Sequence, residues 1–242
     1  MSGTTVHINS KTYTNVKRIF IGNDAFEYKG TLPDGYSIIN GLYSHLGGYI
    51  NTNFPLQVDD IVKVAFVQSS ESASGCFFGV RYAGSYDSDP ASHMMINKGL
   101  WGSGANRRSY SLIICGEPIL PDGVLAPYNP SYLEDVENEV IFDVGNGVYL
   151  NGEAVDIPYD YSFTQNSMTY SPYLFANNNQ NGNVTTRYDH KSGRLLGYSV
   201  ERNGEVVVDM VPVKTADDVF GMYDLARDTF FGSANNLAFS NV

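Results

Sequence analysis

Residues 193–211 read GRLLGYSVERNGEVVVDMV, and this stretch decides the fold class of the chain. Apolar residues recur at every second position on both sides of the pair Asn203-Gly204. Alternation with a period of two predicts strands, and Asn-Gly between them predicts a two-residue hairpin turn, because both turn positions need positive φ. We therefore expect 194–200 to pair with 205–211. The residues expected on the apolar faces are Leu196, Tyr198, Val200, Val206, Val208 and Met210.

The same alternation recurs along most of the chain. Further strands are predicted at 49–54, 60–68, 75–82, 92–96, 109–115, 138–157 and 171–176. Their expected inward residues are Val62, Val64, Phe66, Cys76, Phe78, Val80, Tyr82, Val140, Phe142 and Val144. No segment shows sustained helical periodicity, so no helix is expected to cross between strands. Many short strands without such helices predict an all-β, antiparallel two-sheet jelly-roll sandwich.

Residues 1–35 are predicted to form a small N-terminal unit and linker, and 36–242 the main domain. Within 4–30, alternating apolar positions and Gly- or Asn-containing turns predict a β-meander. This unit has too few apolar residues for a core of its own. We therefore expect it to pack on the main domain, on a second subunit or on a larger assembly.

The net charge of −11 excludes two classes of partner. Nucleic acid and anionic membranes both repel an acidic surface. No apolar run approaches membrane-spanning length, and residues 1–13 lack the basic and apolar regions of a signal peptide. Cys76 and Cys115 lie in apolar runs, which indicates two buried thiols, while a disulfide between them stays open as an alternative.

Four pieces of the chain, in order, resemble the laminin-G-like, concanavalin A-like jelly-roll domains of phage structural proteins and of gut-bacterial surface proteins. They are YINTN at 49–53, VYLNG at 148–152, LFAN at 174–177, and a closing segment that runs from GRL at 193–195 through DMVP at 209–212 to GMYDL at 221–225. The resemblance implies a jelly-roll fold. It implies no particular ligand, because such domains include sugar binders, protein binders and purely structural members.

The N-terminal unit, with VKRIFIGN at 16–23 and FEYKG at 26–30, is similar to short β-modules that open some phage tail and appendage proteins. This similarity implies an attachment module followed by a lectin-like head. The implied partners are other virion proteins, bound by the N-terminal unit, and host-surface glycans, bound by the jelly roll. Exposed fibres and decorations are usually symmetric, so we expect a homo-oligomer and take a trimer as the working hypothesis.

A polysaccharide hydrolase of the same fold is the main catalytic alternative. The motif of such enzymes resembles E-x-D-x-x-E on one strand, which directs two carboxylates into one cleft about 5 Å apart. The acidic cluster here is EDVENE at 134–139, where no Asp lies two residues after a Glu and three before another. We interpret this cluster as a solvated segment leading into the strand at Val140, and predict no catalytic residues.

No metal or cofactor site is predicted. The four histidines are far apart in the sequence, so a zinc site is not expected. Calcium at the rim of the sandwich stays an alternative. Asp87, Asp89 and the amide-rich loop 177–183 offer oxygen ligands, although no complete calcium loop is readable.

A sugar-binding site would combine an aromatic platform with planar polar side chains. The candidate ligand-binding residues are Trp101, Arg107, Arg108, Tyr110, Asn177, Asn179 and Asn181. The alternative for Trp101 is that it anchors its loop in the core. Tyr223 and Asp224 are interpreted as structural, because they belong to the segment that closes the sandwich.

The sequence therefore predicts a non-catalytic structural protein of the phage virion, either a tail or appendage fibre or a capsid decoration. It would be made in the host cytoplasm without a signal peptide and exposed on the particle. The alternatives are a glycoside hydrolase of the same fold and a bacterial surface adhesin module. The missing carboxylate pair opposes the first alternative. The start at Met1 without an export signal opposes the second.

Overall fold

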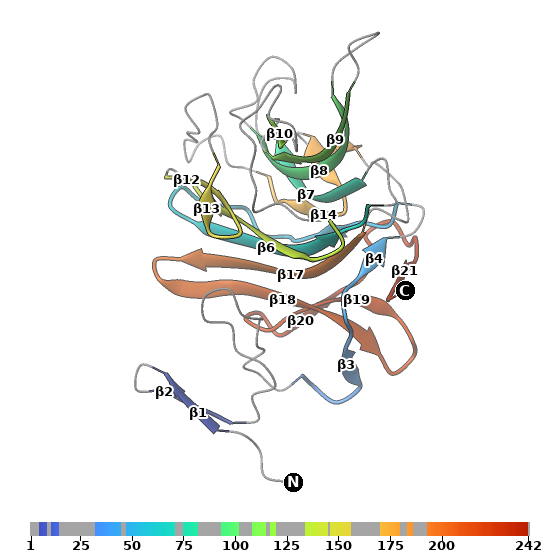
Figure 1. Ribbon diagram of the computed structural model, residues 1–242. Coiled ribbons are helices and arrows are strands. Elements are labelled where there is room, and N and C mark those ends of the chain that lie inside the picture. The colour runs from blue at the N-terminus through green and yellow to red at the C-terminus, as the bar shows by residue number, and fades with distance from the viewer. Residues whose placement is uncertain are drawn as a thin grey trace.

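The fold is built from β-strands. The computed structural model describes residues 5–8, 11–14, 32–44, 47–70, 75–81, 93–101, 108–114, 117–119, 134–144, 146–155, 170–179, 183–185 and 193–241. These residues form strands and turns, with no helix among them and hence none that could span a membrane. Two layers of strands lie one over the other (Figure 1), so the predicted all-β sandwich is confirmed.

The two layers are named here after their central strands. The β7 sheet contains, in spatial order, β10 (Glu117–Ile119), β9 (Arg108–Ile114), β8 (His93–Trp101), β7 (Gly75–Arg81), β14 (Tyr173–Leu174) and β5 (Ile50–Asn51), with β15 (Asn177–Asn179) and β16 (Asn183–Thr185) beside them. The β17 sheet contains β13 (Glu153–Ala154), β12 (Gly147–Leu150), β11 (Glu137–Asp143), β6 (Ile61–Gln68), β17 (Gly193–Arg202), β18 (Glu205–Thr215), β19 (Phe220–Asp224) and β20 (Thr229–Phe231), and β3 (Tyr36–Ile38) pairs with β18.

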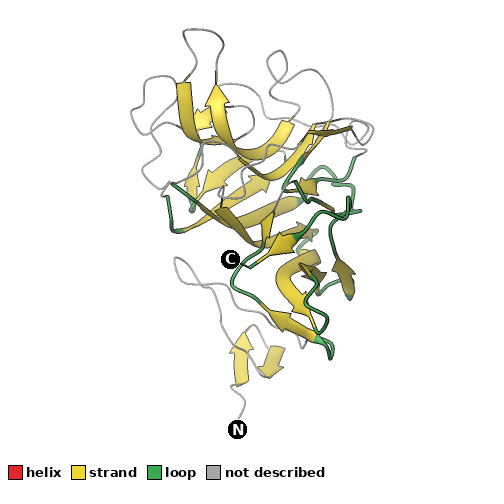
Figure 2. Cartoon of the chain, turned by 90° about the vertical axis from the view of Figure 1, so that its right-hand side faces the viewer, coloured by secondary structure: helices red, strands yellow, loops and turns green. Residues whose placement is uncertain are grey.

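Two small sheets complete the described strands. One joins β4 (Tyr43–Ser44) to β21 (Phe239–Ser240). The other is the N-terminal hairpin of β1 (Thr5–Ile8) and β2 (Lys11–Thr14), which pairs with no other described strand (Figure 2). This hairpin supplies two strands of the predicted meander. The rest of that meander, at 15–31, lies outside the described residues.

The C-terminal hairpin forms at its predicted position. β17 pairs with β18 in antiparallel register, and Arg202 faces Glu205 across the turn. The turn residues Asn203 and Gly204 have φ values of 54° and 78°. Both are positive, as the Asn-Gly pair predicts for a turn that follows the natural strand twist.

The core lies between the two sheets and is joined by aromatic contacts. Phe66 of β6 packs on Phe77 of β7, with ring centroids 4.7 Å apart. Phe78 of β7 packs on both Phe142 of β11 and Tyr198 of β17, at 5.4 and 5.8 Å. All five side chains are buried, and burying each large apolar side chain stabilises the fold by about 1.5–3 kcal/mol. The packing of these rings therefore holds the two layers together.

Bulges correct three of the predicted inward positions. An irregularity between Cys76 and Phe78 places Phe77 as well as Phe78 in the core cluster, and Cys76 lies outside it. Another between Leu195 and Gly197 makes Leu195 the core residue, so Leu196 is only half-buried. A third, between Val200 and Glu201, leaves Val206 55% exposed. Each bulge adds one residue to a strand, which reverses the alternation beyond it.

Two predicted loops contain strands. Residues 177–183 were predicted to form a polar loop, but Asn177 to Asn179 are β15, and β16 begins at Asn183. β10 forms within 116–134, a stretch that holds four of the ten prolines and from which an irregular surface segment is expected. Cys115, the calcium candidates Asp87 and Asp89, and Tyr82 lie outside the described residues.

Gly79 leaves the space that Asn177 occupies. A Cβ on Gly79 would overlap Oδ1 of Asn177, whose buried side chain lies across β7. The same oxygen accepts a hydrogen bond from Sγ of Cys76 at 3.4 Å. The absence of a side chain at position 79 therefore leaves the space in which the Asn177 amide lies.

We predict that Gly79→Ala destabilises the protein by about 1–3 kcal/mol, the usual effect of overfilling a packed site. Urea unfolding measures this change. The control is Gly197→Ala, because Gly197 is also buried in a strand but a Cβ there would meet its nearest neighbour at 3.7 Å. Adding Asn177→Ala to Gly79→Ala should restore most of the lost stability. If the double variant is as unstable as the sum of the two single variants, the proposed clash is wrong.

Candidate functional site

A buried ion pair lies at one end of the sandwich, where β6 begins and β17 ends. Asp60 precedes β6 and is fully buried, and Arg202 is the last residue of β17. Nε and Nη2 of Arg202 donate to Oδ1 and Oδ2 of Asp60, each at 2.8 Å. The main-chain N–H of Gln57 donates to Oδ2 as well, at 2.7 Å. The hydrogen bond with Asp60 raises the pKa of Arg202, so the guanidinium stays charged in this two-point contact.

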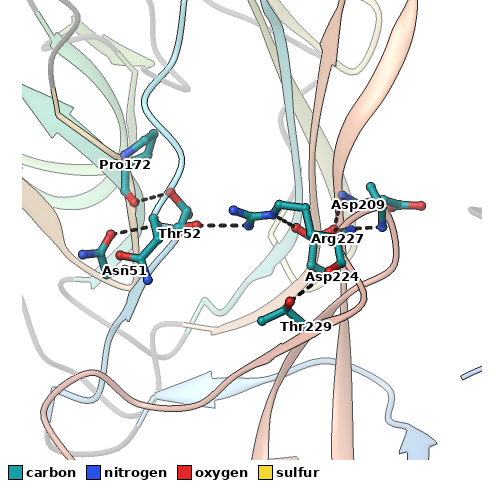
Figure 3. A network of polar contacts seen from close by, with 9 residues as sticks. Asn51, Thr52, Pro172, Asp209, Asp224, Arg227 and Thr229 are labelled. Atoms are coloured by element: carbon teal, nitrogen blue, oxygen red, sulfur yellow. Dashed lines mark hydrogen bonds and ion pairs between the residues drawn. The ribbon is translucent and has the colours of Figure 1, made fainter. Parts of the chain in front are cut away.

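A second buried ion pair lies at the end of β19 (Figure 3). Asp224 is fully buried, and its Oδ1 accepts the main-chain N–H groups of Asp209, Ala226 and Arg227 at 3.0–3.2 Å. Its Oδ2 accepts Nε of Arg227. Nη2 of Arg227 then donates to the carbonyl oxygen of Thr52 at 3.0 Å. Because Thr52 follows β5, this arginine links the β17 sheet to the β7 sheet.

Phe54 lies between the two arginines. The guanidinium carbon of Arg202 is 4.8 Å from the centre of its ring, and that of Arg227 is 5.4 Å away. Cation–π contact of this kind contributes about 0.5–2 kcal/mol, more when the pair is shielded from water. We call Thr52, Phe54, Asp60, Arg202, Asp224 and Arg227 the end cluster.

The end cluster has a structural role, because its ion pairs and hydrogen bonds hold one end of the sandwich together. Every carboxylate oxygen of Asp60 and Asp224 already accepts at least one hydrogen bond, so neither group is open to a substrate. The nearby Tyr198 is buried, and this burial raises the pKa of its hydroxyl well above the usual range. A group that stays neutral at all ordinary pH values is a poor general base. Tyr223 is engaged as well, since its hydroxyl bonds Asp228.

The acidic segment 134–139 is arranged as predicted. Glu134 and Glu137 are exposed, and β11 begins at Glu137. Glu139 is half-buried, and burial raises the pKa of its carboxyl group, although Lys63 opposes this shift. The segment is therefore a largely solvated start of a strand.

The predicted aromatic candidates lie at one end of the β8–β9 pair. Trp101 is the last residue of β8 and faces Arg108, the first residue of β9, while Tyr110 faces Gly99. The prediction placed Trp101 and Arg108 in a loop, so their positions at the strand ends are a correction. The pairing brings these three positions together at the end of one hairpin. Arg107 lies outside the described residues.

The predicted asparagine candidates lie at the opposite end of β7 and β8. Asn179 faces Arg81, which in turn faces His93, the first residue of β8. With about 3.3 Å per residue, the eight steps from His93 to Trp101 separate the two groups by roughly 25 Å. Asn177 is buried and packed against Gly79, which favours a structural role for its amide. Asn181 lies outside the described residues.

The outer face of the β7 sheet carries polar and aromatic side chains. Residues that alternate with the core positions of these strands lie on the outer side of the sheet. They are Tyr49, Asn51, Gly79, Arg81, Met95, Asn97, Tyr173, Asn177 and Asn179. Tyr49 also packs against the core cluster, and Met95, Asn97, Tyr173 and Asn177 are buried. Tyr49 stacks on Tyr173 at 5.0 Å, and burial raises the pKa of the Tyr173 hydroxyl. We call this set the β7 outer face.

Two polar groups of this face have unused hydrogen-bonding capacity. Nε of Arg81 is buried without a hydrogen-bond partner, while Arg81 as a whole is partly exposed. Asn97 is 1% exposed, and its Nδ2 contacts Sδ of Met95, but its Oδ1 has no partner. An unmade hydrogen bond of a buried group costs about 1–3 kcal/mol. Such groups mark places where a further partner would be stabilising. The accessible margin of the face consists of Tyr49, Asn51, Arg81 and Asn179.

The sequence pattern did not single out Arg81, Tyr49 or the members of the end cluster other than Asp224, which was interpreted as structural. Arg81 ends a strand that was correctly predicted, and Phe78 and Val80 lie in the core as expected, so the alternation already places Arg81 on the other face; nothing local marked it as a site residue. Asp60 and Arg202 are 142 residues apart, and no local pattern predicts that they meet. A signal was present in their positions, since each is a charged residue at the boundary of a strongly apolar strand.

Within the described residues, neither a set of metal ligands nor similarity to a known protein indicates a further site. No three His, Cys, Asp or Glu side chains within the described ranges could jointly hold a metal ion. No protein-family model matches the chain, and no curated protein is significantly similar to it.

We predict that Asp60→Asn destabilises the protein by about 3 kcal/mol, because Arg202 would keep its charge in a largely buried position without a carboxylate. The value is at the low end for buried pairs, since the Arg202 side chain is 21% exposed. Thermal or urea unfolding measures it. In the matched surface pair Lys214–Asp218, Asp218 is 75% exposed, so Asp218→Asn should change stability by less than about 1 kcal/mol. Equal effects of the two substitutions would show that the end cluster does not stabilise the fold more than a surface ion pair does.

Proposed function

We propose that this protein is a non-catalytic structural protein of a bacteriophage virion whose jelly roll binds glycans through the β7 outer face. The observation that supports glycan binding is the joint presence, at the accessible margin of one sheet face, of the Tyr49 ring, which stacks on the buried Tyr173, and of Arg81, whose Nε has no hydrogen-bond partner among the described residues. Sugars stack their apolar ring faces on aromatic side chains. Their hydroxyl groups pair with planar amide and guanidinium groups.

The shape of this face fits an extended ligand. The margin around Arg81 and the hairpin end at Trp101 and Arg108 are roughly 25 Å apart on adjacent strands. A chain of several sugar units would reach from one to the other, whereas a monosaccharide would occupy only one of them. Weak binding at each position would add up along such a chain, and an oligomer would multiply it further.

The virion assignment rests on the sequence resemblance. The closing segment at 193–225 resembles that of phage jelly-roll domains, and the N-terminal unit is similar to phage attachment modules. In this proposal the N-terminal unit holds the protein on the particle through other virion proteins, and the jelly roll faces outward. Peptide mass spectrometry and immunogold labelling of purified particles test it. Absence of the chain from the particles would refute the virion assignment and leave glycan binding to be judged separately.

We predict that Arg81→Gln and Tyr49→Ala each weaken binding to a glycan-array hit by about ten-fold, equivalent to about 1.4 kcal/mol. Arg81→Gln removes a charged hydrogen-bond donor, and Tyr49→Ala removes the ring on which a sugar would stack. The matched controls are Arg194→Gln and Tyr36→Ala. Nε of Arg194 is also unpartnered and Tyr36 also contacts a tyrosine, Tyr223, but both lie in the β17 sheet. Binding that is lost in the controls and kept in the test variants would place the site elsewhere. Release of reducing ends from the bound polysaccharide would favour the hydrolase alternative instead.

A further inference from the structure

The chain contains five Asn-Gly pairs, and the structure distinguishes their chemistry. They begin at Asn40, Asn146, Asn151, Asn181 and Asn203. In such a pair the main-chain nitrogen of glycine is unhindered and can attack the side-chain amide carbon of the asparagine. The attack requires that the carboxamide rotates freely and that the glycine nitrogen is accessible. Asn181 lies outside the described residues, and the other four pairs differ in both respects.

Asn151 is held in place. Its Oδ1 accepts the main-chain N–H of Glu139 at 2.8 Å, and its Nδ2 donates to Oδ1 of Asn138 at 2.9 Å. Both ends of the carboxamide are therefore bound to β11. To reach the nitrogen of Gly152, the side chain would have to give up both hydrogen bonds, which stabilise the present rotamer.

Asn146 and Asn40 are each restrained in one way. Nδ2 of Asn146 donates to Oδ1 of Asp143 at 2.8 Å, which fixes its carboxamide on an exposed turn. The carboxamide of Asn40 is exposed, but Gly41 is buried beside Arg194, whose Cδ is 2.7 Å from where a Cβ on Gly41 would lie. The nucleophile of that pair is therefore shielded.

Asn203 carries neither restraint. Both Asn203 and Gly204 are exposed, and, apart from Gly204 and its two chain neighbours, no heavy atom of the described residues lies within 4 Å of where a Cβ on Gly204 would be. The Asn203 carboxamide makes no hydrogen bond in the described part of the chain. The hairpin turn thus presents a free amide next to an open glycine nitrogen.

We propose that Asn203 is a site of spontaneous covalent modification, and that it reacts before the other described Asn-Gly pairs. The nitrogen of Gly204 attacks Cγ of Asn203. A new C–N bond forms, the bond from Cγ to Nδ2 breaks, and ammonia leaves with the proton that the glycine nitrogen gives up. Water then opens the cyclic imide at either of its two carbonyl carbons, which gives aspartate or isoaspartate at position 203.

The position of the turn gives this reaction a structural consequence. Arg202, the neighbour of Asn203, holds the buried carboxylate of Asp60 in the end cluster. Isoaspartate adds a carbon to the main chain of a turn that spans two residues between the paired Arg202 and Glu205. The longer turn cannot keep that register, and either product adds a negative charge between Glu201 and Glu205. Modification at Asn203 therefore weakens the ion pair between Arg202 and Asp60 as the protein ages.

The test is ageing of the full chain in warm, mildly alkaline buffer, followed by peptide mapping with mass spectrometry that separates aspartate from isoaspartate. We expect Asn203 to convert several-fold faster than Asn40 and Asn146, with Asn151 the slowest. In urea, where the fold is lost, the four sites should react at similar rates. A native chain in which Asn151 converts as fast as Asn203 would overturn the proposal.

A second readout tests the consequence. The melting temperature of the aged protein should fall in proportion to the fraction converted at Asn203. The variant Asn203→Gly keeps a Gly-Gly turn compatible with the same hairpin and should age without this loss. An equal fall in the variant, or full conversion of the wild type with no fall, would refute the link to the end cluster.

Discussion

The contact of Phe78 with Tyr198 and Phe142 is the interaction on which the rest of the structure depends, because it covers the apolar face of one sheet with that of the other. Each sheet has one face that water does not solvate well, and neither is stable until that face is covered. Once the layers are stacked, three kinds of surface remain. They are the open ends between the layers, the sheet edges and the two outer faces, and each has its own chemical requirement.

The end cluster meets the requirement of one open end. The chain crosses there from β5 in one sheet to β6 in the other, through residues 52–60. Main-chain groups that leave a strand lose their ladder partners, and Thr52 and Asp60 at the two ends of this path are fully buried. Arg227 supplies a hydrogen-bond partner to the carbonyl of Thr52, Arg202 one to that of Pro55, and Asp60 accepts the N–H of Gln57. The buried charges thus satisfy a polar crossover that apolar side chains of equal size could not. These hydrogen bonds offset part of the free energy that it costs to remove the two ion pairs from water.

The sequence predicts the strands well and the faces less well, for one physical reason. Alternation, Asn-Gly turns and the absence of helical periodicity are local, and the hairpin of β17 and β18 follows from them directly. Bulges are set by how neighbouring strands twist and pair, so the sequence did not predict that Leu195 rather than Leu196 enters the core. Burial of an asparagine-rich segment is equally non-local. The side chain of Asn177 is buried because Gly79, almost a hundred residues earlier, leaves room for it. The candidate site suffers most, because Arg81 and Asn179 become neighbours only through strand pairing.

The two faces of the β7 sheet differ in how strongly packing constrains their side chains. Its inner face consists of rings and aliphatic side chains whose shapes must fit those of β6 and β17, so few substitutions there are neutral. Its outer face has no such partner sheet among the described strands, and Nε of Arg81 has no hydrogen-bond partner among the described residues. Stability is thus supplied by the inner faces and the end cluster. At the accessible margin of the outer face, Arg81 and Asn179 are not part of the buried core cluster, so their side-chain chemistry is less constrained by the packing of the two sheets than that of the inner face.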